Sequence, residues 1–96
     1  MTYEVRQTAE FEEWIEGLRD QKAVEKIAQR ITRIEYGLMG DVKFFSGVGE
    51  LRIDYGPGYR VYFCRRGKVI ILLLCGGAKK TQTRDIRKAI KMAKEE

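Results

Sequence analysis

The 96-residue chain contains no histidine, and it has only two cysteines, Cys64 and Cys75. Zinc sites in proteins are built mainly from histidine and cysteine, and a serine or cysteine nucleophile is usually activated by an imidazole. The composition therefore argues against a zinc site and against histidine-assisted catalysis. We expect any chemistry of this chain to need neither a metal ion nor another cofactor.

The two cysteines are not expected to form a disulfide. If the chain reverses at residues 66–67, Cys64 pairs with Val69. The same register pairs Cys75 with Gly58, which separates the two sulfurs by roughly 20 Å at ~3.3 Å per residue. We expect two small buried side chains, as in proteins of the reducing cytoplasm.

Long hydrophobic runs are absent as well. The longest apolar run, residues 69–75, is seven residues long, whereas a membrane-spanning helix needs about 20. The first residues show no basic region followed by an apolar stretch, which a secretory signal would show. We expect a cytoplasmic protein with no membrane partner.

What the chain does contain is enough for one folded domain. Hydrophobic residues make up 44% of the sequence and charged residues 34%, with a single proline. This composition is far from that of a disordered chain. Because a chain of this length forms a single core, we expect one domain over residues 1–96.

Positive charge is concentrated in the second half of the chain. Residues 1–48 carry 7 basic and 9 acidic side chains, net −2, whereas residues 49–96 carry 12 basic and 5 acidic side chains, net +7. A one-sided positive field is typical of proteins that bind a polyanion, most often nucleic acid or the ribosome. The alternative is that these side chains only solvate a helix surface.

Hydrophobic spacing predicts a short strand followed by two helices. Residues 3–6 alternate as a strand does, and Thr8 offers a cap to the helix that follows. The apolar positions of the two helices recur at three and four residues: Phe11, Trp14, Ile15 and Leu18 in the first, and Ala23, Ile27, Ile31 and Ile34 in the second. The second helix is expected to end at Gly37.

The remaining elements are expected to be three strands and a last helix. Four glycines predict a loop over residues 37–49, anchored by Phe44 and Phe45. Strands are predicted over 50–55, 59–65 and 69–74, with the sheet ending at the glycine pair 76–77, and the last helix has its apolar stripe at Ile86, Ala89, Ile90 and Ala93. The order β-α-α-β-β-β-α predicts an α+β fold, with a small, mainly antiparallel sheet and the helical hairpin on one face.

Alternation along the predicted strands places several polar side chains together. If the apolar positions of 50–55 and 59–65 face the helices, Arg52, Asp54, Arg60 and Tyr62 project from the opposite face. We expect that face to be open to solvent, where paired guanidiniums are suited to binding phosphate. The alternative is an ordinary polar outer face of an antiparallel sheet.

A second cationic segment follows the last strand. In GGAKKTQT, Lys79 and Lys80 precede the start of the last helix, an arrangement that favours anions. The alternative is a plain strand-to-helix connection with a threonine cap.

Several stretches resemble the bacterial RelE/ParE toxin superfamily. They are GVGELRIDYGPGYRVYF (residues 47–63), ILLLCGGAKKTQTRDIRKA (residues 71–89), the pattern F-x-x-W-x-x-x-L-R-D (residues 11–20) and G-x-x-G-D-x-K (residues 37–43). Within the superfamily the chain is most similar to the phage-derived addiction-module killer proteins of the RelE/HigB branch. The resemblance covers nearly the whole chain, and it implies the same small α+β fold.

The resemblance also implies a function. It indicates the toxin of a type II toxin–antitoxin pair, held inactive by a cognate antitoxin that in this branch is usually a small helix-turn-helix protein. The activity it implies is cleavage of messenger RNA in the ribosomal A site, by metal-independent attack of a 2′-hydroxyl on the adjacent phosphate. Two alternatives remain: a ParE-like poison of DNA gyrase, and a non-catalytic protein that binds only its antitoxin or operator DNA.

The resemblance also implies site residues, at the positions of this chain that match the motifs of the family. Arg60 matches the arginine that the family places at the scissile phosphate, Arg52 a basic residue of the preceding strand, and Lys79 or Lys80 the basic segment after the last strand. The expected RNA contacts are Lys43, Arg65, Tyr62, Arg84 and Arg87.

The proton donor and acceptor are less clear from the resemblance. Ribonuclease members commonly carry a histidine or tyrosine near the start of the last helix, and this chain has neither there. The choice among Lys80, Tyr62, Glu50 and Asp85 stays open at this point.

Overall fold

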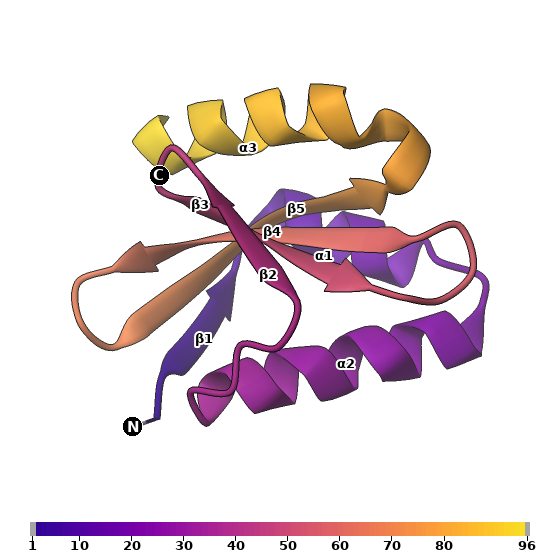
Figure 1. The fold of residues 1–96 in the computed structure, drawn as a ribbon, viewed down its shortest axis with the longest axis horizontal. Helices are drawn as coiled ribbons and strands as arrows, with labels where there is room; N and C mark the ends of the chain where they lie inside the picture. The colour runs from indigo at the N-terminus through magenta and orange to yellow at the C-terminus, as the bar shows by residue number, and fades with distance from the viewer. Residues whose placement is uncertain (1, 96) are drawn as a thin grey trace.

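A five-stranded sheet with helices on both faces forms the body of the protein in a computed structural model, which describes residues 2–95 (Figure 1). Helices α1 and α2 lie on one face and α3 on the other. The elements are β1 (Glu4–Gln7), α1 (Ala9–Glu16), α2 (Gln21–Glu35), β2 (Val42–Phe45), β3 (Val48–Ile53), β4 (Tyr59–Arg66), β5 (Ile70–Ala78), a 3₁₀ turn η1 (Lys79–Thr81) and α3 (Gln82–Glu95). The α+β fold class and the helical hairpin are confirmed.

The sheet has the strand order β1-β5-β4-β3-β2. Strand β1 runs parallel to β5, and every other neighbouring pair is antiparallel. The central strands β4 and β5 are therefore paired on both sides, as their apolar sequences indicate. Among residues 2–95, no helix is long and apolar enough to cross a membrane.

Both N-terminal helices begin at side-chain caps. The Thr8 hydroxyl accepts a hydrogen bond from the amide of Phe11 at 3.1 Å, as its position in the sequence predicts. The Asp20 carboxylate accepts from the amides of Lys22 and Ala23 at 3.0 and 3.2 Å. These bonds satisfy amides that a helix leaves unpaired in its first turn, and they fix where the hairpin turns.

The sheet has a separate hydrophobic core on each face. On the side of α1 and α2 the core consists of Phe11, Ile27, Ile34, Leu51, Ile53, Val61, Phe63, Ile71 and Leu73. On the side of α3 it consists of Val48, Tyr62, Cys64, Leu74, Cys75 and Ala89. Each fully buried aliphatic side chain contributes roughly 1.5–3 kcal/mol to this packing. Side chains that alternate along the strands thus contribute to both cores.

The expectation of an open second face is wrong. Helix α3 covers much of that face, so that Tyr62 has no exposed surface and Arg60 keeps only 9% of its own. The narrow apolar stripe of α3, with Ala89 fully buried, packs on the alternate residues of β4 and β5. The narrow stripe is sufficient because its small residues let the helix approach the sheet closely.

The segment expected to be a loop forms a hairpin. Strand β2 pairs with β3 from Val42–Leu51 to Phe45–Val48, leaving Ser46 and Gly47 as a two-residue turn. Their φ angles are 46° and 83°, as the tight turns of hairpins require. The segment whose glycines indicate a loop therefore forms a tight turn and adds β2 as an edge strand.

Strand β5 continues through the glycine pair at which we expected the sheet to end. A Cβ on Gly76 would collide with the indole of Trp14, and one on Gly77 would collide with the carboxylate of Asp85. The two glycines allow helices on opposite faces to come close to the same strand. The strand ends only after Ala78.

The two cysteines are buried, as expected, but their register differs from the predicted one. Cys64 lies opposite Leu72, and Cys75 lies opposite Tyr62. The turn between β4 and β5 covers residues 67–69, and this moves the partner of Cys64 three residues from the predicted one. A β-bulge after Tyr62 moves the partner of Cys75 by one residue more, which strand alternation alone does not predict. Both thiols belong to the core beneath α3.

Candidate functional site

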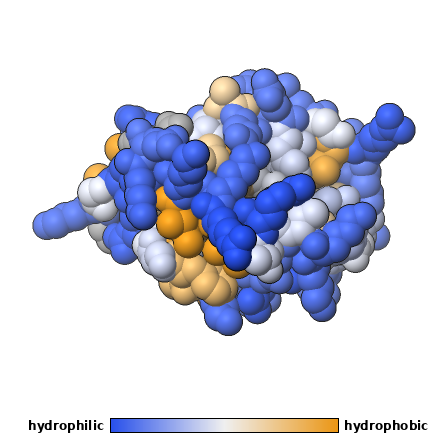
Figure 2. Space-filling view, turned by 90° about the horizontal axis from the view of Figure 1, so that it is seen from above, coloured by the Kyte–Doolittle hydropathy of each residue, from blue (hydrophilic) through white to orange (hydrophobic). Residues whose placement is uncertain are grey.

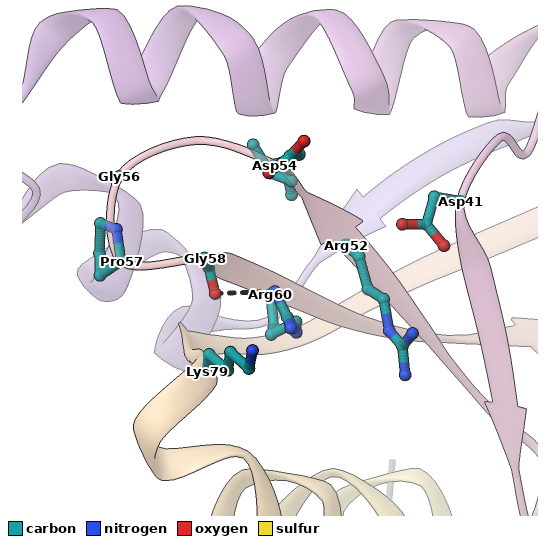
Figure 3. A pocket seen from close by; sticks show the side chains of 9 residues that line it. Asp41, Arg52, Asp54, Gly56, Pro57, Gly58, Arg60 and Lys79 are labelled. Carbon is teal, nitrogen blue, oxygen red and sulfur yellow. Dashed lines mark hydrogen bonds between the residues drawn. The ribbon is translucent and has the colours of Figure 1, made fainter.

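A hollow of about 480 Å³ opens where β3 turns into β4 (Figure 3). We call it the first hollow. Its lining residues are Asp41, Arg52, Ile53, Asp54, Gly56, Pro57, Gly58, Arg60 and Lys79. Three of these side chains are cationic, and they come from β3, β4 and η1.

Arg60 is the most enclosed cation of the first hollow. Its guanidinium donates from Nη1 to the carbonyl oxygens of Gly58 and Tyr59 at 2.9 and 3.4 Å. Its Nε is buried and has no hydrogen-bond partner among the described residues. An unpaired buried donor carries a desolvation cost of about 1–3 kcal/mol, which an anion that accepts from it would offset.

Arg52 lies directly opposite Arg60 on the neighbouring strand. Like charges at opposite positions of a sheet repel each other, and an anion placed between the two guanidiniums would relieve this repulsion. The alternation of the two strands predicted this juxtaposition, and the register confirms it. Both side chains line the first hollow.

Gly58 brings Lys79 close to Arg60. Its φ of 74° belongs to the left-handed region, which glycine adopts without strain. A Cβ at this position would lie 3.2 Å from Nη1 of Arg60 and 3.3 Å from Cβ of Lys79. The turn between β3 and β4 therefore narrows the space so that Lys79 and Arg60 share one hollow.

A buried hydrogen-bond network supports Arg52 from behind. The Glu50 carboxylate is fully buried and accepts from Nε of Arg52 at 2.9 Å and from the Tyr62 hydroxyl at 3.0 Å. The side-chain amide of Gln82, at the start of α3, donates to the same carboxylate at 2.9 and 3.1 Å. One carboxylate thus links β3, β4 and α3 and orients Arg52.

The contacts with Glu50 fix the protonation states of Arg52 and Tyr62. The hydrogen bond to Glu50 raises the pKa of Arg52 above its ordinary value. Burial, and then the hydrogen bond to Glu50, raises the pKa of Tyr62 far above its ordinary value. Arg52 therefore stays cationic and Tyr62 stays protonated at neutral pH.

Two of the expected acid–base residues, Asp85 and Glu50, form hydrogen bonds outside the first hollow. Asp85 is 3% exposed and accepts from the Thr81 hydroxyl at 2.6 Å and from Nε of Arg84 at 3.3 Å. Glu50 accepts from its own network, and neither carboxylate lines the first hollow. The carboxylates that do line it are Asp41 and Asp54.

Asp41 was not singled out in the sequence because its segment was expected to be a loop. Arg30 of α2 donates to the main-chain oxygens of Met39 and Asp41 at 3.3 Å each, and to that of Arg52 at 2.5 Å. Partial burial lowers the pKa of this arginine. Arg30 thus joins the approach to β2 to the end of β3, and this connection sets the place of Asp41 at the hollow. The G-D pair before an apolar run was the only signal in the sequence.

A second hollow, of about 540 Å³, lies beside the start of α3. Its lining residues are Lys80, Thr81, Thr83, Arg84 and Arg87. Lys79 and Lys80, which the sequence treats as equivalent, are thereby divided between the two hollows. Viewed from the side of α3, the surface is dominated by hydrophilic side chains, with small groups of hydrophobic atoms open between them (Figure 2).

The other expected RNA contacts lie apart from both hollows. The Lys43 ammonium sits 5.2 Å from the centroid of the Phe45 ring, and the Arg65 guanidinium 5.3 Å from that of Tyr3. Neither residue lines either hollow. The expectation that Tyr62 presents its ring on an open face is wrong, because α3 buries it.

Comparison with known proteins places this chain among phage-derived proteins. The model of the family described as phage-derived protein Gp49-like (DUF891) matches residues 13–96. A protein of Haemophilus influenzae is 44% identical over 96 residues, which cover 99% of this chain and 97% of the relative, and its name assigns it no activity. The chain belongs to the phage-derived Gp49-like family, an addiction- or toxin-like family.

Proposed function

We propose that the protein is the toxin of a type II toxin–antitoxin pair, and that it cuts messenger RNA in the ribosomal A site. The proposal places it in the RelE/HigB branch of the RelE/ParE superfamily. The observation that carries it is Arg60, a nine-tenths buried guanidinium with an unpartnered Nε, next to two further cations. Such a group needs an anion, and a toxin of this kind meets one in the phosphodiester of its substrate.

The proposed reaction is an internal transfer at phosphorus. The 2′-oxygen of a ribose attacks the adjacent phosphorus, its proton passes to a base, and a bond forms between that oxygen and phosphorus. The bond from phosphorus to the 5′-oxygen of the next nucleotide breaks, and that oxygen takes up a proton. The products are a 2′,3′-cyclic phosphate and a free 5′-hydroxyl, so no water or outside reactant is consumed.

The first hollow supports this reaction mainly through charge. The pentavalent phosphorus in the transition state carries more negative charge on its oxygens than the starting phosphodiester does. Arg52, Arg60 and Lys79 surround the space where those oxygens would lie, and preorganised donors of this kind are usually the largest contribution to such catalysis. Asp41 and Asp54, at the same hollow, are the carboxylates available to take the proton.

The same charge suggests how an antitoxin would inhibit the protein. A small helix-turn-helix antitoxin that lays acidic side chains over the first hollow would neutralise Arg52 and Arg60 and exclude the RNA. Inhibition would then be steric and electrostatic together. A toxin–antitoxin complex in which Arg52, Arg60 and Lys79 stay fully open would contradict this part of the proposal.

The proposal is tested by adding the purified protein to a message, first naked and then positioned on ribosomes with an empty A site. Mapping of the RNA ends is expected to show cuts within the A-site codon on ribosomes, each leaving a 2′,3′-cyclic phosphate. Growth arrest with intact messages and broken chromosomal DNA would point to gyrase instead. Normal growth after induction without antitoxin would leave only a binding role.

A further inference from the structure

The second hollow gathers three cations at the start of α3. Helix α3 carries several lysines and arginines, and Lys88 forms an ion pair with Glu10 of α1. Within residues 2–95, Lys80 and Arg87 form no ion pair. Two of the three cations of the hollow, Lys80 and Arg87, thus have no carboxylate partner among the described residues, whereas Arg84 pairs with Asp85.

The lining of the second hollow indicates the chemistry of its ligand. All five lining residues are polar: three cations and two threonine hydroxyls. The one carboxylate nearby, Asp85, is 3% exposed and contacts Arg84 alone among the three cations. Methyl groups and aliphatic stems form most of the surface of this hollow, but no aromatic or large aliphatic side chain lines it to anchor a protein partner. The guanidiniums, the Lys80 ammonium and the Thr83 hydroxyl suit phosphate oxygens, whereas the Thr81 hydroxyl already donates to Asp85.

The two hollows lie on either side of one short turn. Lys79 and Lys80 are consecutive residues of η1, and their side chains line the first and second hollows respectively (Figure 3 shows Lys79 beside Arg60). Consecutive Cα atoms are about 3.8 Å apart. A single extended strand that passes over η1 therefore meets both hollows within a few nucleotides.

We infer that the second hollow binds the phosphate backbone of the same RNA strand, next to the phosphodiester held in the first hollow. Lys80, Arg84 and Arg87 hold one or more flanking phosphates and so fix the register of the strand over the turn. The contact reads the backbone and not the bases. This inference rests on the proposed function only for the identity of the strand, because binding is measured apart from cutting.

The test uses a labelled single-stranded RNA octanucleotide that carries a 2′-O-methyl group on every ribose, so that the attacking oxygen is blocked. Its affinity for the full-length protein is measured by fluorescence anisotropy over a range of salt concentrations. The variants are Lys80→Gln and Arg87→Gln. The matched control is Lys91→Gln, an exposed lysine of α3 that does not line the hollow.

Lys80→Gln and Arg87→Gln are each expected to weaken binding of the octanucleotide about two- to fivefold, the range for an exposed charge pair. Each is also expected to lower the slope of log affinity against log salt by about 0.7, the value for one phosphate of a single strand. Lys91→Gln should change neither quantity, and a dinucleotide should bind all four proteins alike. Thermal melting of every variant establishes that it is folded.

Several results would overturn the inference. They are equal effects of Lys80→Gln and Lys91→Gln, failure of the wild type to bind the octanucleotide at low salt, and complete displacement of the RNA by millimolar inorganic phosphate. A polyglutamate peptide that binds more tightly than the RNA, and loses this advantage in Lys80→Gln, would assign the hollow to an acidic protein partner. Binding that depends on Lys80, in a protein that cuts no message on ribosomes, would refute the proposed function and leave this inference standing.

Discussion

Glu50 shows how a residue can serve the site without touching a substrate. It lies wholly inside the protein, and its carboxylate joins Arg52, Tyr62 and Gln82. A buried carboxylate is stabilised only by such partners. The burial of Glu50 therefore argues for a positioning role behind Arg52, in place of the proton-transfer role that the sequence left open.

Glu50→Gln is expected to keep the shape of the network and to remove its charge. Arg52 would lose its charged partner but keep a neutral one, so the concentration of ribosomes needed for half-maximal cutting should rise about three- to tenfold, as for the loss of one ordinary hydrogen bond. Tyr62→Phe removes a hydrogen bond of the same network but leaves the Glu50–Arg52 contact. If both variants change cutting equally, Glu50 supports the fold and not the position of Arg52.

Cys75 is buried in the core beneath α3. Burial raises the pKa of its thiol to about 12, so almost none of it is thiolate at pH 8. We expect neither Cys75 nor the equally buried Cys64 to react with iodoacetamide in the native protein, and both to react in guanidinium chloride. Mass spectrometry counts the adducts, and rapid alkylation of the native protein would contradict the placement of α3.

At the scale of elements, α3 has three tasks. Its apolar stripe closes the second core, Gln82 reaches Glu50, and its outer side chains line the second hollow. These tasks require α3 to lie close to the end of β5, where Gly77 meets Asp85. The site therefore depends on a contact between backbone and carboxylate that lies outside both hollows.

Gly77→Ala tests that close approach. The added methyl group would force Asp85 or α3 to move, and we expect a loss of unfolding free energy of about 1–3 kcal/mol, as for other overpacked sites. Chemical denaturation measures the change. Gly17→Ala is the comparison: its φ is −81° and the added Cβ would lie 3.3 Å from a backbone oxygen, against 1.9 Å from the Asp85 carboxylate at Gly77, so a smaller loss is expected. Equal stability of Gly77→Ala and the wild type would show that α3 does not lie this close to β5.

The hairpin of α1 and α2 carries a pH-dependent contact. Asp20 caps α2 and accepts from the Tyr55 hydroxyl at 2.8 Å, and this bond, followed by the amide bonds, lowers the pKa of Asp20 below its ordinary value of 3.8. A carboxyl with a lowered folded-state pKa adds stability above its unfolded pKa and loses it as the pH falls through the folded pKa. The contribution should therefore be complete at neutral pH.

Asp20→Asn keeps a capping oxygen and removes the charge. The melting temperature of the variant should be below that of the wild type at pH 7, and the difference should shrink as the pH falls below about 4. Thermal melts from pH 7 to pH 2.5 follow the change. A difference that stays constant over this range would refute the assigned role of the charge.

At the scale of the whole molecule, the alternation of two strands was enough to place Arg52 and Arg60 side by side. Successive side chains of a strand point to opposite faces of the sheet, so the register is fixed wherever one face is apolar and buried. The order of helices and strands was predicted by the same reasoning, apart from β2. That strand is four residues long and lies between glycines, so its sequence has too few alternating positions to separate it from a loop.

The enclosure of the site could not be predicted in the same way. Whether Tyr62 and Glu50 are solvated or buried depends on where α3 docks, and its contacts are far apart in the sequence. The bulge after Tyr62 and the partition of Lys79 from Lys80 likewise depend on tertiary packing. The sequence therefore predicted which cations meet, but not what surrounds them.

The asymmetry of charge in the sequence corresponds to a division of tasks in the fold. The half with net charge −2 supplies the hairpin that supports the sheet, and the half with net charge +7 supplies both hollows apart from Asp41. A field of one sign over adjoining hollows attracts a polyanion and speeds its encounter. Cutting should therefore slow as salt rises, even where the chemical step is unchanged.

The most direct test of the account is the single-turnover rate at which saturating protein cuts a message on ribosomes. Arg60→Gln is expected to lower this rate about 10²- to 10³-fold, the cost of losing one donor to transition-state charge. Lys68→Gln, which removes an exposed cation just after β4 and outside both hollows, should leave it unchanged. Because Arg60 is buried, the melting temperature of each variant is measured alongside. A folded Arg60→Gln protein that cuts at the wild-type rate would contradict the central claim that this guanidinium holds the phosphate.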